Sequence, residues 1–206
     1  MNFKVKKELK DFLVFKKNYK FDFKEIIKKD DFLYCDGEVI ESLNGERIGE
    51  SESWINVGFK LSGTFSKALS NLFPYEFKFR GKKLNSIENF FQGIKFKDKK
   101  VQDYVFQYSE IPAAVIKCAS DYDWKKTGKV YWQGKEIDRY SDDYKLLIDE
   151  LYISAIQNPL YRGALKNCNK YIVHSMGDIE EKDTTFTRYE FEYELNCLKD
   201  FLKEYK

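Results

Sequence analysis

Apolar residues recur at helical spacing along most of the chain, and the clearest case is residues 85–96. At about 100° per residue, the apolar side chains there fall on one arc of a helix: Ile87, Phe90, Phe91 and Ile94. A second, polar stripe runs along the edge of that arc and consists of Glu88, Gln92 and Lys95. The pattern predicts a helix that buries one face and carries a polar edge beside it.

The polar edge has two interpretations. A carboxylate, an amide and an amine on one edge can position a water, orient a substrate and act as acid, base or nucleophile. The spacing of Asn85 and Glu88 also fits a capping box, in which Asn85 caps the helix and Glu88 reaches back to its free backbone N–H. Because such signatures are common, spacing alone favours the cap with a solvated polar edge.

Similar patterns predict helices over residues 4–16, 98–108 and 109–119, and others that begin near Ser141, Asn158 and Thr187. The last of these is marked by a capping box of Thr187 and Glu190. Phe186 and Phe191 flank it at the spacing of a hydrophobic staple. We therefore expect a well-defined helix at the end of the chain.

Strand signals are fewer and shorter. Alternating or β-branched runs predict strands over residues 32–35, 77–80 and 171–173. A surface hairpin is expected over residues 36–53, with its turn at Asn44-Gly45. Together with the helices, these strands predict a single α+β domain, mainly helical, with a small sheet.

Composition narrows the class of protein. Of the 206 residues, 43% are hydrophobic, which is enough for a packed core and argues against disorder. The formal net charge of +2 argues against a dedicated nucleic-acid coat, although a local basic groove remains open. No apolar run approaches the roughly 20 residues of a membrane span.

The cysteines indicate reduced thiols. Cys35, Cys118, Cys168 and Cys197 are scattered without a Cys-x-x-Cys pair, and His174 is the one histidine that could join them. This spacing does not fit a structural zinc site, so we expect neither a metal nor another cofactor. The sequence predicts a cytoplasmic protein with no membrane partner.

The first 58 residues contain a basic segment followed by an acidic one. Residues 1–30 form a basic, helical N-terminal arm, with ten lysines against four acids up to residue 29. The arm packs on the main domain with a solvated lysine face, or contacts nucleic acid, or binds a protein partner. Residues 36–58 form an acidic hairpin insertion to which we assign no chemistry.

A series of short motifs then follows in a fixed order over residues 65–201. It comprises Leu69-Ser70-Asn71-Leu72-Phe73-Pro74, a strand with Gly81, the Ser86 to Lys95 helix, and Gln157-Asn158-Pro159-Leu160-Tyr161. The series resembles the NADAR, or YbiA-like, family, whose pattern runs Ser-Asn-Phe-x-Pro, a short strand with Gly, Ser-x-Glu-x-x-x-Gln-x-x-Lys and a later Gln-Asn-Pro helix pair. The resemblance implies that residues 31–206 form a NADAR/YbiA-like domain.

The resemblance also implies an activity. Members of the family cleave N-glycosidic bonds, either between ADP-ribose and guanine in nucleic acid or in ribosyl-pyrimidine phosphates of the riboflavin pathway. We therefore expect an N-glycosidase that removes ADP-ribose from modified guanine, with the pyrimidine substrate as the alternative. A non-catalytic protein that binds ADP-ribose or NAD is a third hypothesis. The expected partners are an ADP-ribose-containing or ribosyl-phosphate substrate and, through it, a nucleic acid.

Two residues match the catalytic positions of the family. Glu88 corresponds to its catalytic glutamate and would stabilise positive charge at the anomeric carbon or activate water. Lys95, two turns further on, would bind phosphate or capture the ribose carbon as a Schiff base.

Other residues are candidates for substrate binding: Asn71 and Gln92 for ribose hydroxyls, Arg80 for phosphate, and Phe91 or Trp132 for stacking on a base. Each has a structural alternative. Asn71 could hold the turn before Pro74, Arg80 could be an exposed strand residue, and Trp132 could belong to the core.

One segment departs from the family pattern. Many members end with Asp-x-x-Trp-Gly, which helps to close the site, whereas this chain has residues 174–177 and 184–187 there. His174 could supply the missing acid or a donor to phosphate, or could serve a structural hydrogen bond. The departure affects the expected substrate more than the expected fold.

Overall fold

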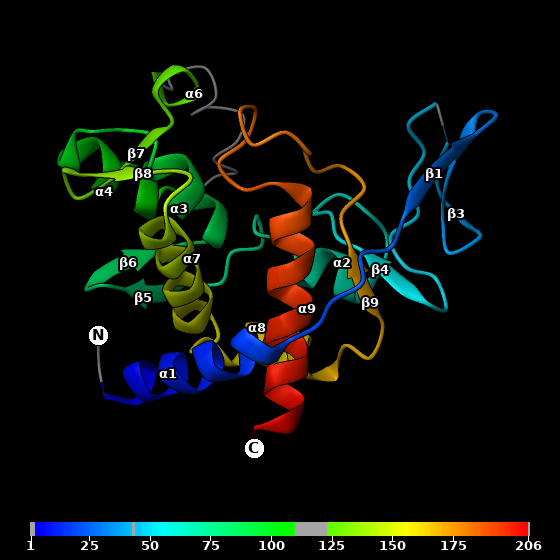
Figure 1. The fold of residues 1–206 in the computed structure, drawn as a ribbon, viewed down its shortest axis with the longest axis horizontal. Coiled ribbons are helices and arrows are strands. Elements are labelled where there is room, and N and C mark those ends of the chain that lie inside the picture. The colour runs from blue at the N-terminus through cyan, green and yellow to red at the C-terminus, as the bar shows by residue number, and fades with distance from the viewer. Residues whose placement is uncertain (1–2, 43, 110–122, 206) are drawn as a thin grey trace.

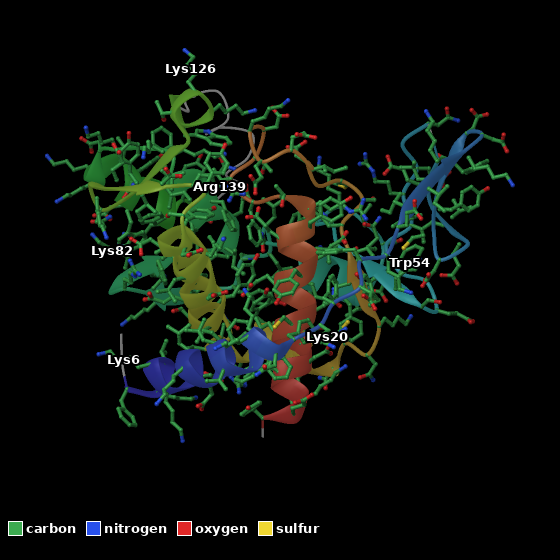
Figure 2. The ribbon with its side chains drawn as sticks, viewed as in Figure 1. Lys6, Lys20, Trp54, Lys82, Lys126 and Arg139 are labelled. Atoms are coloured by element: carbon green, nitrogen blue, oxygen red, sulfur yellow. The ribbon has the colours of Figure 1, made fainter. Side chains whose placement is uncertain are left out.

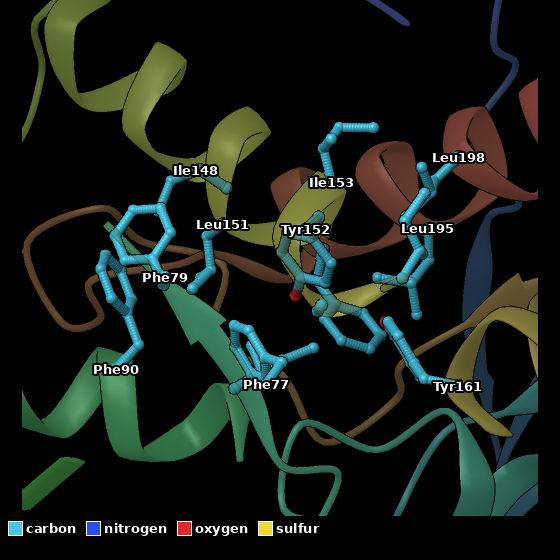
Figure 3. Packing of buried hydrophobic residues seen from close by; sticks show 14 of the residues in the cluster. Phe77, Phe79, Phe90, Ile148, Leu151, Tyr152, Ile153, Tyr161, Leu195 and Leu198 are labelled. Carbon is cyan, nitrogen blue, oxygen red and sulfur yellow. The ribbon is translucent and has the colours of Figure 1, made fainter. Parts of the chain in front are cut away.

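Helices α7 (Asp142–Ala155) and α9 (Arg188–Glu204) form the centre of the computed structural model, which describes residues 3–42, 44–109 and 123–205 (Figure 1). Ser141 caps α7 by accepting a hydrogen bond from the Tyr144 N–H. The predicted capping box of Thr187 and Glu190 begins α9 and is confirmed. Both helices bury most of their surface, and Figure 3 shows their side chains within the main core.

Helix α1 (Phe3–Asn18) packs across the far end of this pair, near the C-terminus of α9 (Figure 1). It contacts α7 and α9 and buries Val5 and Phe12, and the Phe12 ring lies 5.4 Å from the Phe201 ring. The helix predicted over residues 4–16 is confirmed. Its lysines are exposed except for Lys16, and Lys6 is labelled in Figure 2.

The described residues form four small sheets rather than the one expected. A three-stranded antiparallel sheet, β1 (Ile26–Lys29), β2 (Phe32–Cys35) and β3 (Glu38–Ser42), projects from the helices (Figure 1). The strand predicted over 32–35 is confirmed, whereas β1 was not expected. The hairpin expected over residues 36–53 is confirmed around its turn at Asn44-Gly45: after β3 the chain runs back antiparallel, with Glu41 opposite Arg47 and the Ile48 N–H donating to the Ile40 carbonyl. The pairing of β3 with β2 through a turn at Asp36-Gly37 was not expected.

The other sheets are two-stranded. Strand β4 (Trp54–Asn56) pairs in parallel with β9 (Tyr171–Val173), which confirms the strand predicted there. Strands β7 (Lys129–Trp132) and β8 (Lys135–Asp138) form a hairpin, as do β5 (Phe77–Phe79) and β6 (Lys82–Leu84). Arg80 and Gly81 make the β5–β6 turn with positive φ angles of 45° and 85°, so Arg80 is a turn residue and not the predicted strand residue.

Five further helices complete the described part of the chain: α2 (Thr64–Ala68), α3 (Ile87–Gly93), α4 (Lys99–Gln107), α6 (Asp123–Thr127) and α8 (Pro159–Asn167). Asp98 caps α4 and Asn158 caps α8, which confirms helices predicted there. The helix predicted over 109–119 lies almost wholly outside the described residues. In the parts described, no helix is both long and apolar enough to cross a membrane.

Candidate functional site

At the start of α3, the side chain of Glu88 takes no part in capping the helix. Ser86, and not Asn85, is the N-cap: its side chain accepts a hydrogen bond from the Asn89 N–H at 3.1 Å. The Asn85 amide instead donates to the Gln107 carbonyl across the α3–α4 contact. The predicted capping box is therefore wrong, and the Glu88 side chain does not cap the helix.

A hydrogen-bonded series runs along the polar edge of α3. The Gln92 amide nitrogen donates to Glu88 Oε1 at 2.5 Å, and Lys95 Nζ donates to Gln92 Oε1 at 2.9 Å. All three side chains are partly buried. An amide can donate at one end and accept at the other, so Gln92 joins a carboxylate to an amine. Lys95 Nζ also lies 5.6 Å from the centre of the Trp124 ring.

The polar edge of α3 lines a cavity of about 200 Å³. The cavity brings together six of the eight predicted site residues: Asn71, Glu88, Phe91, Gln92, Lys95 and His174. Residues 176–178, residues 184–186 and Phe191 complete its described lining. A larger hollow of about 490 Å³ lies between α1, α8 and the end of α9, and it contains none of the predicted site residues. The smaller cavity is therefore the candidate site.

Asn71 is fixed on the wall of the cavity by two hydrogen bonds. Its carbonyl accepts from the Glu88 N–H at 2.8 Å, and its side-chain Oδ1 accepts from the Tyr152 hydroxyl at 2.9 Å. Burial raises the pKa of Tyr152 well above its ordinary value, so the hydroxyl keeps its proton and donates. Among the described residues, the Asn71 amide nitrogen has no hydrogen-bond partner, and it is a candidate donor to a ligand.

His174 follows β9 and presents an acceptor. Its Nδ1 lies 2.8 Å from the Val57 carbonyl oxygen, which can only accept, so Nδ1 carries the proton. The ring lies 4.8 Å from the Phe191 ring. Burial lowers the His174 pKa, although the bond to Val57 opposes this. The neutral ring therefore offers Nε2 as an acceptor, which suits neither proton donation nor a donor role toward phosphate.

Two predicted residues lie outside the cavity lining. The Arg80 guanidinium pairs with Glu150 of α7, with nitrogen–oxygen distances of 2.7 and 3.0 Å. Trp132 packs in the core, where its ring centre lies 4.8 Å from that of Phe79 and 5.3 Å from that of Phe106. Phe91 does line the cavity, but its ring already stacks on Phe186 at 4.9 Å. The contacts of Trp132 correspond to its structural alternative, whereas Arg80 is a turn residue paired with Glu150 and not the exposed strand residue of its alternative.

Residues 176–178 and 184–186 form a wall of the cavity that the sequence did not predict, although Phe186 was expected to pack against Phe191. The Tyr144 hydroxyl donates to the Thr185 carbonyl, and Phe186 stacks on Phe91 as well as contacting Phe191. Their position in the sequence could have indicated this role, because the resembled family has its closing motif at the same place. In the described residues, no group of three or more His, Cys, Asp or Glu side chains is arranged to hold a metal ion.

Comparisons with known proteins find a phage relative and a bacterial structure of low similarity. The family model described as bacteriophage protein GP30.3 matches residues 63–200. An uncharacterized 17.1 kDa protein from the Gp30-rIII intergenic region of Enterobacteria phage T4 is 34% identical over 140 residues, which cover 66% of this chain and 91% of the relative. The NMR structure of YbiA from E. coli shares 18% identity at a TM-score of 0.45 and covers 74% of this chain and 86% of YbiA. The phage relative is uncharacterized, so these similarities identify no substrate.

Proposed function

This chain belongs to the bacteriophage protein GP30.3 family, and we propose that its cavity is the active site of an N-glycosidase that hydrolyses a ribosyl C–N bond. The observation that carries the proposal is the convergence of Glu88, Lys95 and Asn71 on one cavity. Such a bond breaks through a transition state with positive charge at the anomeric carbon, and a fixed carboxylate beside that carbon stabilises it.

Glu88 is suited to this role by its place in α3. It lies in the first turn of the helix, and its side chain lines the cavity. Gln92 holds Oε1, and Oε2 has no hydrogen-bond partner within the described part of the chain. In the proposed reaction, Oε2 faces the sugar and accepts a proton from the attacking water. The oxygen of that water bonds to the anomeric carbon as the C–N bond breaks toward the base.

Lys95 is the one lysine or arginine among the described lining residues. As an ammonium group it would contact a substrate phosphate or protonate the departing base, and as an amine it would attack the anomeric carbon to form a Schiff base. His174 is not the acid in this scheme, because its neutral ring carries its proton toward Val57. Asn71 would donate its amide hydrogen to a ribose hydroxyl.

The first candidate substrate is guanine in nucleic acid that carries ADP-ribose, as the family resemblance implies. A cavity of about 200 Å³ is smaller than the roughly 300–1,000 Å³ of pockets for drug-sized ligands. It would hold the ribose at the scissile bond and leave the rest of a large substrate outside. The same size favours the second candidate, a ribosyl-pyrimidine phosphate. The lysines of α1 do not support either choice, because none of them is among the described residues that line the cavity.

A direct test incubates the protein with DNA that contains ADP-ribosylated guanine and follows released ADP-ribose. We expect release by the wild type and a rate at least about 100-fold lower for Glu88→Gln, since removing a general base typically costs 10²–10⁴ in rate. Glu136→Gln, at an exposed position of β8, is the matched control and should retain activity.

Parallel assays decide between the candidates. Release of ribose 5-phosphate from a ribosyl-pyrimidine phosphate would select the second substrate. Binding of ADP-ribose in calorimetry without release from either substrate would select a non-catalytic binder. A wild type that matches Glu88→Gln on both substrates would contradict the proposed hydrolase.

A further inference from the structure

His174 is held in one orientation from three directions. Its backbone N–H donates to Glu192 Oε1 at 2.8 Å, and its Nδ1–H donates to the Val57 carbonyl at the same distance. Its ring packs against Phe191. A methyl group at Gly177 would lie 2.8 Å from His174 Cδ2, so the glycine leaves room for this ring position. These contacts leave a single polar ring atom, Nε2, for the cavity that His174 lines.

The backbone after His174 is fixed by Asn56 at the end of β4. The Asn56 side chain is fully buried, and its Oδ1 accepts from the Ser175 N–H at 3.0 Å. Its amide nitrogen donates to Ser175 Oγ at 2.9 Å and to the Ile48 carbonyl at 3.1 Å. Asn56 and Val57 precede the part of the chain that the family model matches. The position of His174 is therefore set by residues that lie before the matched part of the chain.

We propose that His174 is a specificity-determining residue, whose Nε2 accepts a hydrogen bond from a hydroxyl of the substrate ribose and disfavours a sugar that lacks it. The inference rests on the proposed function, since it assigns the ribose to the same cavity. Nε2 has no hydrogen-bond partner among the described residues, and a ligand without the hydroxyl would leave this fixed acceptor unpaired in a partly buried site. Asn71 lines the same cavity with a donor, so the cavity offers both an acceptor and a donor to the hydroxyls of a sugar.

Such selectivity has a clear chemical use. Every nucleotide of DNA carries an N-glycosidic bond to 2-deoxyribose, and an enzyme that acts on a ribosyl group attached to DNA must leave those bonds intact. A site that hydrogen-bonds a hydroxyl discriminates far more strongly than a site that senses shape alone. The acceptor on His174 would provide this discrimination within the sugar-binding cavity itself.

The test measures binding and does not require turnover. Ribose 5-phosphate, its 2-deoxy form and its 3-deoxy form are titrated into the full chain and followed by ligand-observed NMR. For the wild type we expect at least one deoxy sugar to bind about tenfold more weakly than ribose 5-phosphate, as the loss of one hydrogen bond to a fixed acceptor predicts. The sugar that loses affinity identifies the hydroxyl.

Two variants at the same position separate the acceptor from the ring. His174→Phe keeps the ring against Phe191 and removes Nε2, so its affinities for the three sugars should become equal within about twofold. His174→Gln supplies an amide oxygen near the place of Nε2 and should restore part of the preference. Thermal unfolding of both variants shows whether each is folded before its affinities are compared.

Several outcomes would overturn the inference: equal binding of all three sugars to the wild type, no binding of ribose 5-phosphate, or an undiminished preference in folded His174→Phe. The outcome for the proposed function is separate. A wild type that prefers the hydroxylated sugar but hydrolyses no substrate would contradict the N-glycosidase and support the role of His174. Hydrolysis of ribosyl, 2-deoxyribosyl and 3-deoxyribosyl substrates at equal rates would support the N-glycosidase and contradict the role of His174.

Discussion

At the scale of single residues, Gln92 decides how the two charged groups of the cavity are presented. The sequence placed it with Asn71 as a candidate for ribose hydroxyls, but both ends of its amide are engaged by Glu88 and Lys95. A neutral amide between a carboxylate and an amine holds both side chains without adding charge. Its first role is therefore to position Glu88 and Lys95, since a ribose hydroxyl would have to share the amide with them.

Substitutions of Gln92 test this positioning role. Gln92→Met should lower kcat by about tenfold or more with little change in KM, since the loss falls on the reacting groups. Gln92→Glu should raise the pKa of the resulting carboxylate pair, because two adjacent carboxylates share a proton, and the acidic limb of the pH–rate profile should move to higher pH. Gln107→Glu, at an exposed position of α4, is the control. A higher KM with unchanged kcat in Gln92→Met would instead indicate direct binding of the sugar.

At the scale of elements, the sequence predicted the longer helices and the polar edge, but it missed the five-residue helices α2 and α6 and the contacts between distant segments. Periodicity identified α3, because its buried face is local to eight residues. The choice between Asn85 and Ser86 as cap was settled by the Gln107 carbonyl, which lies 22 residues along the chain from Asn85. Arg80 likewise pairs with Glu150, 70 residues away. No local pattern contains such partners.

The start of α9 shows a local motif and a distant contact acting on one carboxylate. Glu190 accepts from Thr187 within the capping box and also pairs with Arg139, which is only 2% exposed. Arg139 is labelled in Figure 2 and lies over the Tyr144 ring. The sequence predicted the capping box, whereas the buried arginine arrives from the end of β8. Glu190 therefore neutralises a charge that has little access to water.

Removing this carboxylate should cost more than removing the cap. Thr187→Ala loses the cap alone and should lower the free energy of unfolding by about 1 kcal/mol. Glu190→Ala also leaves the Arg139 charge buried without its partner, and should cost about 3 kcal/mol or more. Urea unfolding of the two variants measures both values, and Arg139→Met with Glu190→Ala should recover part of the loss. Equal costs for the two single variants would contradict a structural role for the ion pair.

At the scale of the whole molecule, Lys16 joins three helices that are far apart in the sequence. Its Nζ pairs with Asp149 of α7 and with Glu194 of α9, in a partly buried position. Burial alone would lower the Lys16 pKa, but the carboxylates of Glu194 and Asp149 raise it overall. Amphipathic spacing predicted α1 as a helix, yet it could not show which of the six lysines in this helix turns inward. Lys16 ties the N-terminal helix to the core that supports the cavity.

The same cluster makes stability depend on pH. Burial raises the pKa of Glu194 from its ordinary 4.5 to about 7, although Lys16 opposes the shift. Between these values the folded protein binds more protons at Glu194 than the unfolded chain does, so this group's contribution to the free energy of unfolding falls as the pH rises from 4.5 to 7. Lys16 is charged in both states throughout this window, because its raised pKa lies above its ordinary 10.5.

Urea unfolding at intervals from pH 4.5 to 7 tests this contribution of Glu194. The free energy of unfolding should decline more steeply for the wild type than for Glu194→Gln, with exposed Glu204→Gln as the control. Identical pH dependence in wild type and Glu194→Gln would show that Glu194 binds no extra proton in the folded state.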